Sequence, residues 1–141
     1  MGFDGTEGGR RALDRAIAES RDSHAHITVL SVANVPLDPE APRYFGTLDD
    51  ISDREGAALA PPPDVVAHLT EARDRLEAAG VDADLTWAAG EPAHTIVETA
   101  RTIGAALIVL GEHHHGFLGN VFGADVDAAV QREAGCEVVL A

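Results

Sequence analysis

Hydrophobic and polar positions along this chain follow two periods, one of about 3.6 residues and one of two. Residues 105–110 are an unbroken apolar run, too short for a core helix, and predict a strand buried on both faces. Residues 27–32 predict a second buried strand. Strict alternation over 81–87 indicates a strand at a sheet edge with one solvated face. A strand ending at Phe3 and a short final strand at 136–140 complete the set.

Four helices are predicted where apolar residues recur at intervals of three and four. The first ends near Asp22 and has Thr6 as its expected N-cap. The longest covers 65–79, and the next covers 92–103, with a proline at its start. The last begins near Asp125. Helices and strands therefore alternate along the whole chain.

This alternation predicts an α/β fold. We expect residues 1–141 to form a single doubly wound, Rossmann-like domain, with a five-stranded parallel sheet of order 3-2-1-4-5 and helices on both faces. Residues 36–63 hold six of the seven prolines and predict a long Pro-rich loop without a core element. Ligands of such sheets bind at the carboxyl ends of the strands, where the order reverses. There the predicted order brings Asp4 beside Gly111.

The first predicted strand is unusually short. Only three residues precede Asp4, whereas a strand typically has about five or six. We therefore expect a shortened central strand, and we expect that residues of the native protein are missing ahead of Met1.

Composition narrows the classes of function. The chain has 24 acidic and 10 basic residues, a formal charge of −14, and every basic residue is Arg. Without Lys, a Walker-type P-loop, a Schiff-base lysine and a Lys-rich patch for nucleic acid or membrane are excluded, and the acidic field repels polyanions. No segment has the ~18 consecutive apolar residues of a membrane span. With one cysteine, Cys136, and no leader pattern, we expect a cytoplasmic protein that binds neither membrane nor nucleic acid.

The segment after the 105–110 run has a composition that suits a phosphate. A strand, a glycine-punctuated loop at 111–123 and a helix N-terminus bring free N–H groups and a helix dipole together. Three consecutive histidines at 113–115 could ligate a metal or bind an anion, but adjacent loop residues rarely converge on one ion, so we expect a polar surface and no metal. Asp4 is equally well explained as a ligand contact and as a turn residue that hydrogen-bonds its own backbone.

Four short motifs, in order, resemble the universal stress protein family. Residues 3–7 (FDGTE) resemble that family's strand-DGSE turn, and residues 89–93 (AGEPA) its G-(D/E)-P-A helix entry. Residues 105–111 (AALIVLG) resemble its GADLIVMG strand, and residues 134–139 (AGCEVV) its APCPVLVV ending. The resemblance covers nearly the whole chain. It implies a cytoplasmic stress-response domain, commonly a homodimer, without a shared catalytic centre.

ATP-binding members of that family carry G-x2-G-x9-G-(S/T) after the fourth strand. Here only Gly111 matches, because the other three positions are His114, Ala124 and Asp125. The G-H-H-like loop of non-binding members is more similar to residues 111–115. Asp4 and Val32, two positions that match the nucleoside-contacting positions of the binders, are kept.

We therefore expect a non-enzymatic regulatory protein of the universal stress class, without a cofactor and with a degenerate nucleotide loop. The alternative is a stress switch that binds AMP or ATP weakly. Its candidate site residues are Asp4, Val32, Gly111, His114, Gly116, Gly119, Ala124 and Asp125. A hydrolase or transferase ranks last, because the loop offers His but neither Ser nor Cys.

The final strand is the expected surface of a homodimer. It lies at a sheet edge, where unpaired backbone groups and apolar side chains favour pairing with a second copy. The candidate interface residues are Val138, Val139 and Leu140.

Overall fold

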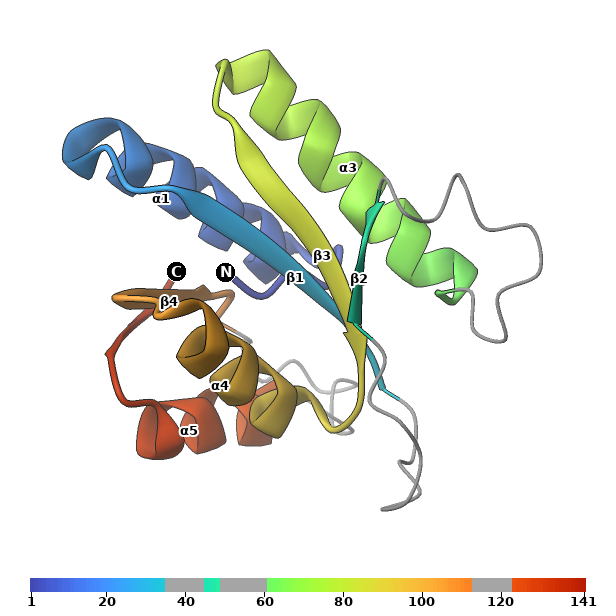
Figure 1. Cartoon of the computed structure of the whole chain (residues 1–141), viewed down its shortest axis with the longest axis vertical. Helices are drawn as coiled ribbons and strands as arrows, with labels where there is room; N and C mark the ends of the chain where they lie inside the picture. The colour runs from blue at the N-terminus through green and yellow to red at the C-terminus, as the bar shows by residue number, and fades with distance from the viewer. Residues whose placement is uncertain (35–44, 49–60, 113–122) are drawn as a thin grey trace.

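The computed structural model describes residues 1–34, 45–48, 61–112 and 123–141. In chain order the elements are α1 (Glu7–Ser23), β1 (Ile27–Ala33), β2 (Phe45–Thr47), α3 (Pro63–Ala79), β3 (Ala83–Ala89), α4 (Pro92–Ile103), β4 (Leu107–Leu110), α5 (Gly123–Glu133) and β5 (Glu137–Leu140). Figure 1 shows them as an α/β fold.

The four predicted helices are all present, and local capping explains their ends. The Thr6 hydroxyl accepts a hydrogen bond from the Gly9 amide at 3.1 Å, as predicted for an N-cap. Glu91 caps α4 by accepting bonds from two backbone amides. Gly80 and Gly104 end α3 and α4 in the left-handed conformation, which glycine adopts without a steric penalty.

The strands pair partly as predicted. β1 is parallel to β3, with Ile27 opposite Ala83, and β4 is parallel to β5, with Leu107 opposite Glu137. The prediction of a loop without a core element over residues 36–63 was wrong at residues 45–47. There the three residues of β2 pair antiparallel with β3, so the sheet is mixed. A strand this short pairs at an edge, where neighbouring prolines do not interrupt a ladder.

β3 is consequently not the edge strand that its alternating pattern indicated. It lies between β1 and β2, and Thr86, expected on a solvated face, is buried. The Thr86 hydroxyl compensates for its burial by donating a hydrogen bond to the Val29 carbonyl at 3.0 Å.

A single five-stranded parallel sheet of order 3-2-1-4-5 is not formed by these strands. They make a three-stranded sheet, β1-β3-β2, and a two-stranded sheet, β4-β5. The first predicted strand is reduced to a bridge between Gly2 and Leu30. Residues 1–3 nevertheless bond to both sheets, because the Phe3 amide donates to the Leu30 carbonyl at 2.9 Å and the Gly2 amide to the Val109 carbonyl at 3.2 Å.

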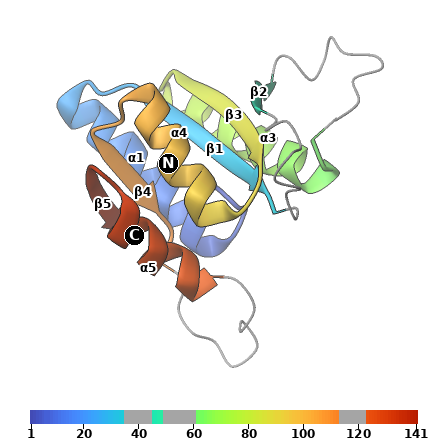
Figure 2. The same ribbon diagram turned by 60° about the horizontal axis from the view of Figure 1, so that its bottom comes forward.

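Helices cover both faces of the strands, as predicted (Figures 1 and 2). On one face α1 and α3 pack through Leu13, Val65 and Leu69 against the odd-numbered side of β1 and β4. On the other, α4 and α5 pack through Ile96 and Val130. In β4, Val109 joins the first core and Ile108 the second, which is the alternation that the apolar run predicted.

Among the described residues, no helix combines the length and the apolar character needed to cross a membrane.

Candidate functional site

A cavity of about 280 Å³ lies at the carboxyl ends of the strands, where residues 1–4 pass between β1 and β4. We call it the switch-point pocket. Its lining residues are Gly2, Phe3, Asp4, Leu30, Val32, Asn34, Pro92, Ile96, Leu110, Gly111, Val126 and Asp127. Doubly wound sheets bind ligands at this place. The structure thus brings together three of the predicted site residues, Asp4, Val32 and Gly111.

Asp4 lies in the turn between residues 1–3 and α1. One of its carboxylate oxygens accepts bonds from the Thr6 amide at 3.0 Å and from the Thr6 hydroxyl at 2.6 Å. This is the bond to the backbone two residues on that a turn aspartate makes. Gly5, between them, has φ +70°, a conformation that favours glycine. Asp4 therefore has a turn role and also lines the pocket.

Gly111 is fixed by packing as well as by its place in the pocket. A Cβ on this residue would lie 2.2 Å from the Gly8 carbonyl carbon and 2.5 Å from the Gly9 nitrogen. The end of β4 and the first turn of α1 therefore touch backbone to backbone. Glycine at 111 is required for this contact, independently of any phosphate.

Asp127 was missed by the sequence reasoning. It lies in α5, is 9% exposed and lines the pocket, and it has interactions within the structure. A signal was available, since Asp127 lies beside Val126 and three residues before Val130, on the apolar stripe of the helix. Acidic residues are seldom buried unless they are paired or functional.

The remaining loop residues contribute less to the described site. His114, Gly116 and Gly119 lie outside the described residues, as do the three histidines at 113–115. The backbone of Ala124 and Asp125 belongs to α5, which begins at Gly123, within two residues of the predicted start near Asp125. Among the side chains of α5 that the structure describes, the carboxylate of Asp127 lines the pocket.

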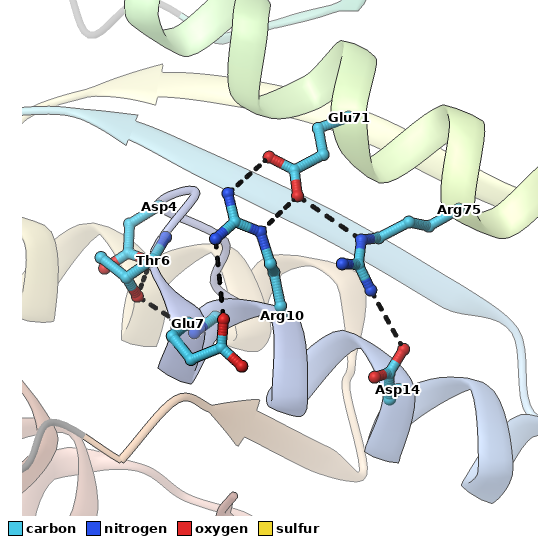
Figure 3. A network of polar contacts seen from close by, with 8 residues as sticks. Asp4, Thr6, Glu7, Arg10, Asp14, Glu71 and Arg75 are labelled. Carbon is cyan, nitrogen blue, oxygen red and sulfur yellow. Dashed lines mark hydrogen bonds and ion pairs between the residues drawn. The ribbon is translucent and has the colours of Figure 1, made fainter.

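Charged side chains beside the pocket are already partnered. Arg10 donates to both oxygens of Glu71, at 2.6 and 3.1 Å, and Arg75 joins Glu71 to Asp14 (Figure 3). Hydrogen bonding between Arg10 and Glu71 raises the pKa of Arg10 and lowers the pKa of Glu71. The network ties α1 to α3, and it pairs Arg10, which also interacts electrostatically with Asp4, with the Glu71 and Glu7 carboxylates.

The described residues that line the pocket include no Arg or His. Two carboxylates, Asp4 and Asp127, line it together with Asn34 and mostly apolar side chains. Arg11 donates to the carbonyl of Glu112, the residue after Gly111, at 3.2 Å.

The predicted interface strand lies at an edge. Along its length β5 pairs only with β4 among the described strands. Val138 and Leu140 pack against the core beneath α4 and α5. Val139 is half-buried and belongs to neither core cluster, so it is the apolar residue of β5 with a free face.

No group of three or more His, Cys, Asp or Glu side chains in the described ranges is arranged to hold a metal ion. The expectation that the protein has no metal site stays a prediction, because the histidine run lies outside those ranges. Cys136 packs as a partly buried residue against the second core.

Comparison with known proteins gives a consistent result. The model of the universal stress protein family matches residues 1–141. The universal stress protein YxiE of Bacillus subtilis is 25% identical over 151 residues, which cover 99% of this chain and 95% of that protein.

Solved structures share the fold. A universal stress protein crystallised in complex with cAMP is 29% identical, covers 100% of this chain and 93% of its own, and superposes with a TM-score of 0.70. A universal stress protein family member from Burkholderia pseudomallei is 23% identical, with coverage of 99% and 91% and a TM-score of 0.66. UspA of Lactobacillus plantarum is 20% identical, with coverage of 98% and 92% and a TM-score of 0.62.

Proposed function

Because the chain belongs to the universal stress protein family, we propose that it is a stress-response regulatory protein that binds ligands without converting them and excludes ATP from its pocket. The proposed exclusion of ATP rests on the presence of two carboxylates, Asp4 and Asp127, in the lining of the switch-point pocket. Each like charge at ~4 Å costs about 1 kcal/mol in water and about 4 kcal/mol near a protein surface. One carboxylate can therefore weaken triphosphate binding by roughly one to three decades.

The size of the pocket supports the same proposal. Its volume of about 280 Å³ is just below the ~300–1,000 Å³ that small-molecule sites occupy. The apolar lining from Leu30, Val32 and Ile96 suits a base or a ring. In the loop, His114, Ala124 and Asp125 replace the glycines and hydroxyl with which the family's binders hold phosphates, so we propose that the loop is degenerate.

Calorimetry with millimolar ATP and Mg²⁺ at pH 7.5 tests the exclusion. We expect no binding tighter than about 100 μM, or roughly −5.5 kcal/mol. Asp127→Asn, which removes one carboxylate at nearly constant volume, should strengthen ATP binding about tenfold or more. Asp82→Asn makes the same charge change at an exposed site away from the pocket and serves as the control. Low-micromolar ATP binding by the unmodified chain would overturn the proposal.

A second set of variants tests the loop. His114→Gly, Ala124→Gly and Asp125→Ser together restore the glycines and hydroxyl of the binders and should strengthen ATP binding. Failure of the restored loop to bind ATP would locate the exclusion in the carboxylates alone.

A nucleotide with a single negative charge is the second candidate. The structure that shares 29% identity with this chain was solved with cAMP, which has one phosphate and one negative charge. The like-charge penalty in the pocket is then far smaller than for ATP. We expect cAMP, and to a smaller extent AMP with its two negative charges, to bind more tightly than ATP at pH 7.5, and equal or weaker binding of cAMP would remove this candidate.

Three further features belong to the proposal. A homodimer formed through β5 is supported by Val139, which is half-buried at a sheet edge and belongs to neither core cluster. The part of the predicted strand order that sets residues 1–3 between β1 and β4 is supported by the bonds of these residues to both strands. A cytoplasmic setting is supported by what the resemblance implies.

A further inference from the structure

Hydrogen-bond acceptors outnumber donors among the side chains of the switch-point pocket. Of the described side chains that line it, three are polar: Asp4, Asn34 and Asp127. An ionised carboxylate only accepts hydrogen bonds, whereas an amide both donates and accepts. Asn34 is therefore the one side-chain donor in the described lining, against two carboxylates. A ligand that fits this lining presents more N–H donors than acceptors.

The two carboxylates come from different elements, and the turn before α1 uses one of them. One oxygen of Asp4 accepts bonds from the Thr6 amide at 3.0 Å and the Thr6 hydroxyl at 2.6 Å. A Cβ on Gly9 would lie 2.6 Å from this oxygen, so the first turn of α1 encloses it. Asp127 comes from α5 and lines the pocket although it is only 9% exposed. Because a carboxylate has about four acceptor positions, Asp127 can bond a ligand in addition to its contacts within the protein.

The rest of the described wall is apolar and suits a flat ring. Leu30, Ile96 and Leu110 line the pocket and are buried members of the second core. Their packing in the core fixes the shape of the wall. A ring placed on this wall has its polar edge free to meet the carboxylates and amides of the lining.

Val32 adds two backbone groups to the pocket. The Leu30 amide donates to the Met1 carbonyl at 2.8 Å, and the Leu30 carbonyl accepts from the Phe3 amide at 2.9 Å. Alternate residues of a strand face the same neighbour, so Val32, two residues on, directs its N–H and C=O to this side as well. Within the part of the chain that the structure describes, residues 1–3 make no main-chain bond to Val32. Val32 therefore offers a ligand one donor and one acceptor.

The two purine bases of nucleotides differ in what they ask of such a lining. Adenine presents one donor, its 6-amino group, beside one acceptor, N1. Guanine presents one acceptor, O6, beside two adjacent donors, N1–H and the 2-amino group. The backbone of Val32 suits either base, because each has a donor next to an acceptor. A carboxylate suits only guanine, because it accepts from two adjacent donors at once and repels the N1 lone pair of adenine.

We propose that the switch-point pocket selects guanine over adenine, and that Asp127 selects it by accepting hydrogen bonds from N1–H and the 2-amino group. A donor for O6 is present in the Asn34 amide and in the Val32 backbone. This inference rests on the proposed function, in which a nucleotide with a single negative charge binds in this pocket. The ligand class is then a guanine nucleotide with one negative charge, such as cGMP.

Calorimetry at pH 7.5 with cGMP, cAMP and cIMP tests the base preference. The three nucleotides have the same charge and the same sugar, so their affinities differ only through the base. We expect cGMP to bind at least tenfold more tightly than cAMP, which is within the range for one bidentate pair. cIMP, which keeps N1–H and O6 but has no 2-amino group, should bind more weakly than cGMP. This comparison uses the unmodified chain and needs no variant.

Asp127→Asn tests the residue. An amide offers one donor and one acceptor, which match adenine. We expect the ratio of cGMP affinity to cAMP affinity to fall at least tenfold. The ratio is unaffected by a loss of folded protein, because both ligands bind the same folded fraction. Asp82→Asn makes the same change at an exposed site and should leave the ratio unaltered.

Equal or tighter binding of cAMP by the unmodified chain would overturn the inference. An unchanged ratio in Asp127→Asn would overturn the role of Asp127, and the absence of binding of both cyclic nucleotides at millimolar concentration would overturn the ligand class. The proposed function fails on a different result, namely low-micromolar binding of ATP. A preference for cAMP with ATP still excluded would therefore refute only this inference.

Discussion

Replacing Gly111 with Ala tests whether this residue is kept for packing. The added Cβ would lie 2.2, 2.5 and 2.6 Å from three backbone atoms of Gly8 and Gly9, whereas ordinary contacts begin near 3.4 Å. Backbone cannot rotate away as a flexible side chain can, so α1 or the end of β4 must shift by about 1 Å. Overpacking a close-packed site costs about 1–3 kcal/mol and sometimes more. We expect about 3 kcal/mol here.

Urea denaturation followed by circular dichroism measures this loss, and a thermal midpoint lower by about 10 °C is expected for a chain of this size. Gly135→Ala is the matched control, because a Cβ on Gly135 meets nothing within 4 Å. That change should be neutral or stabilising by up to about 1 kcal/mol. Gly8→Ala, with one backbone contact at 2.8 Å to the Glu112 carbonyl, should be intermediate. If Gly111→Ala and Gly135→Ala agree within about 0.5 kcal/mol, the close contact of α1 with β4 does not constrain residue 111 and the reasoning is refuted.

Other predictions follow from the charged groups and the sheet edge. Glu71→Gln should lower stability at neutral pH. The hydrogen bond with Arg10 lowers the pKa of Glu71 from 4.5, so the stability that the ionised Glu71 contributes is present above pH 4.5 and is lost as the pH falls through the folded pKa. The difference in stability between variant and parent should therefore vanish in acid, and a difference that persists below pH 3 would contradict this. In a chain that begins at Met1, the free energy of unfolding should rise between pH 6 and 8 by at most about 3 kcal/mol, because the unfolded amine, with a pKa of 8.0, binds a proton that the buried amine does not. Amino-terminal acetylation should remove this slope, and a slope that survives acetylation would assign it elsewhere. Val139→Glu should convert a dimer to a monomer in light scattering at tens of micromolar, and a parent chain that is already monomeric would exclude the β5 interface.

Much of the fold could be predicted from local patterns in the sequence. The helical periods, the Thr6 cap, and the glycines that end α3 and α4 act within a few residues of one another, so they could be predicted without knowing the fold. The apolar run in β4 likewise predicted burial on two faces, because one property of a single segment decides it. The overall α/β class followed from the order of these elements.

Contacts between distant segments needed the tertiary structure. The pairing of β2 with β3 joins residues about 40 positions apart, and no local pattern at 45–47 distinguishes it from the Pro-rich loop around it. Gly111 has the same identity whether it serves a phosphate or a helix, and only the approach of Gly8, about 100 residues away, shows the packing role.

The residues of the candidate site also fall into those that the sequence predicted and those that needed the tertiary structure. Asp4 and Gly111 were predicted from the order of the strands, since parallel strands direct their carboxyl ends to one edge. The place of Asp127 in the pocket was decided by the rotation of α5 about its axis, which brings this carboxylate to the pocket. Sequence determines which elements form, because their causes are local, whereas the tertiary structure decides which of their atoms meet, because that depends on the register and rotation of every element together.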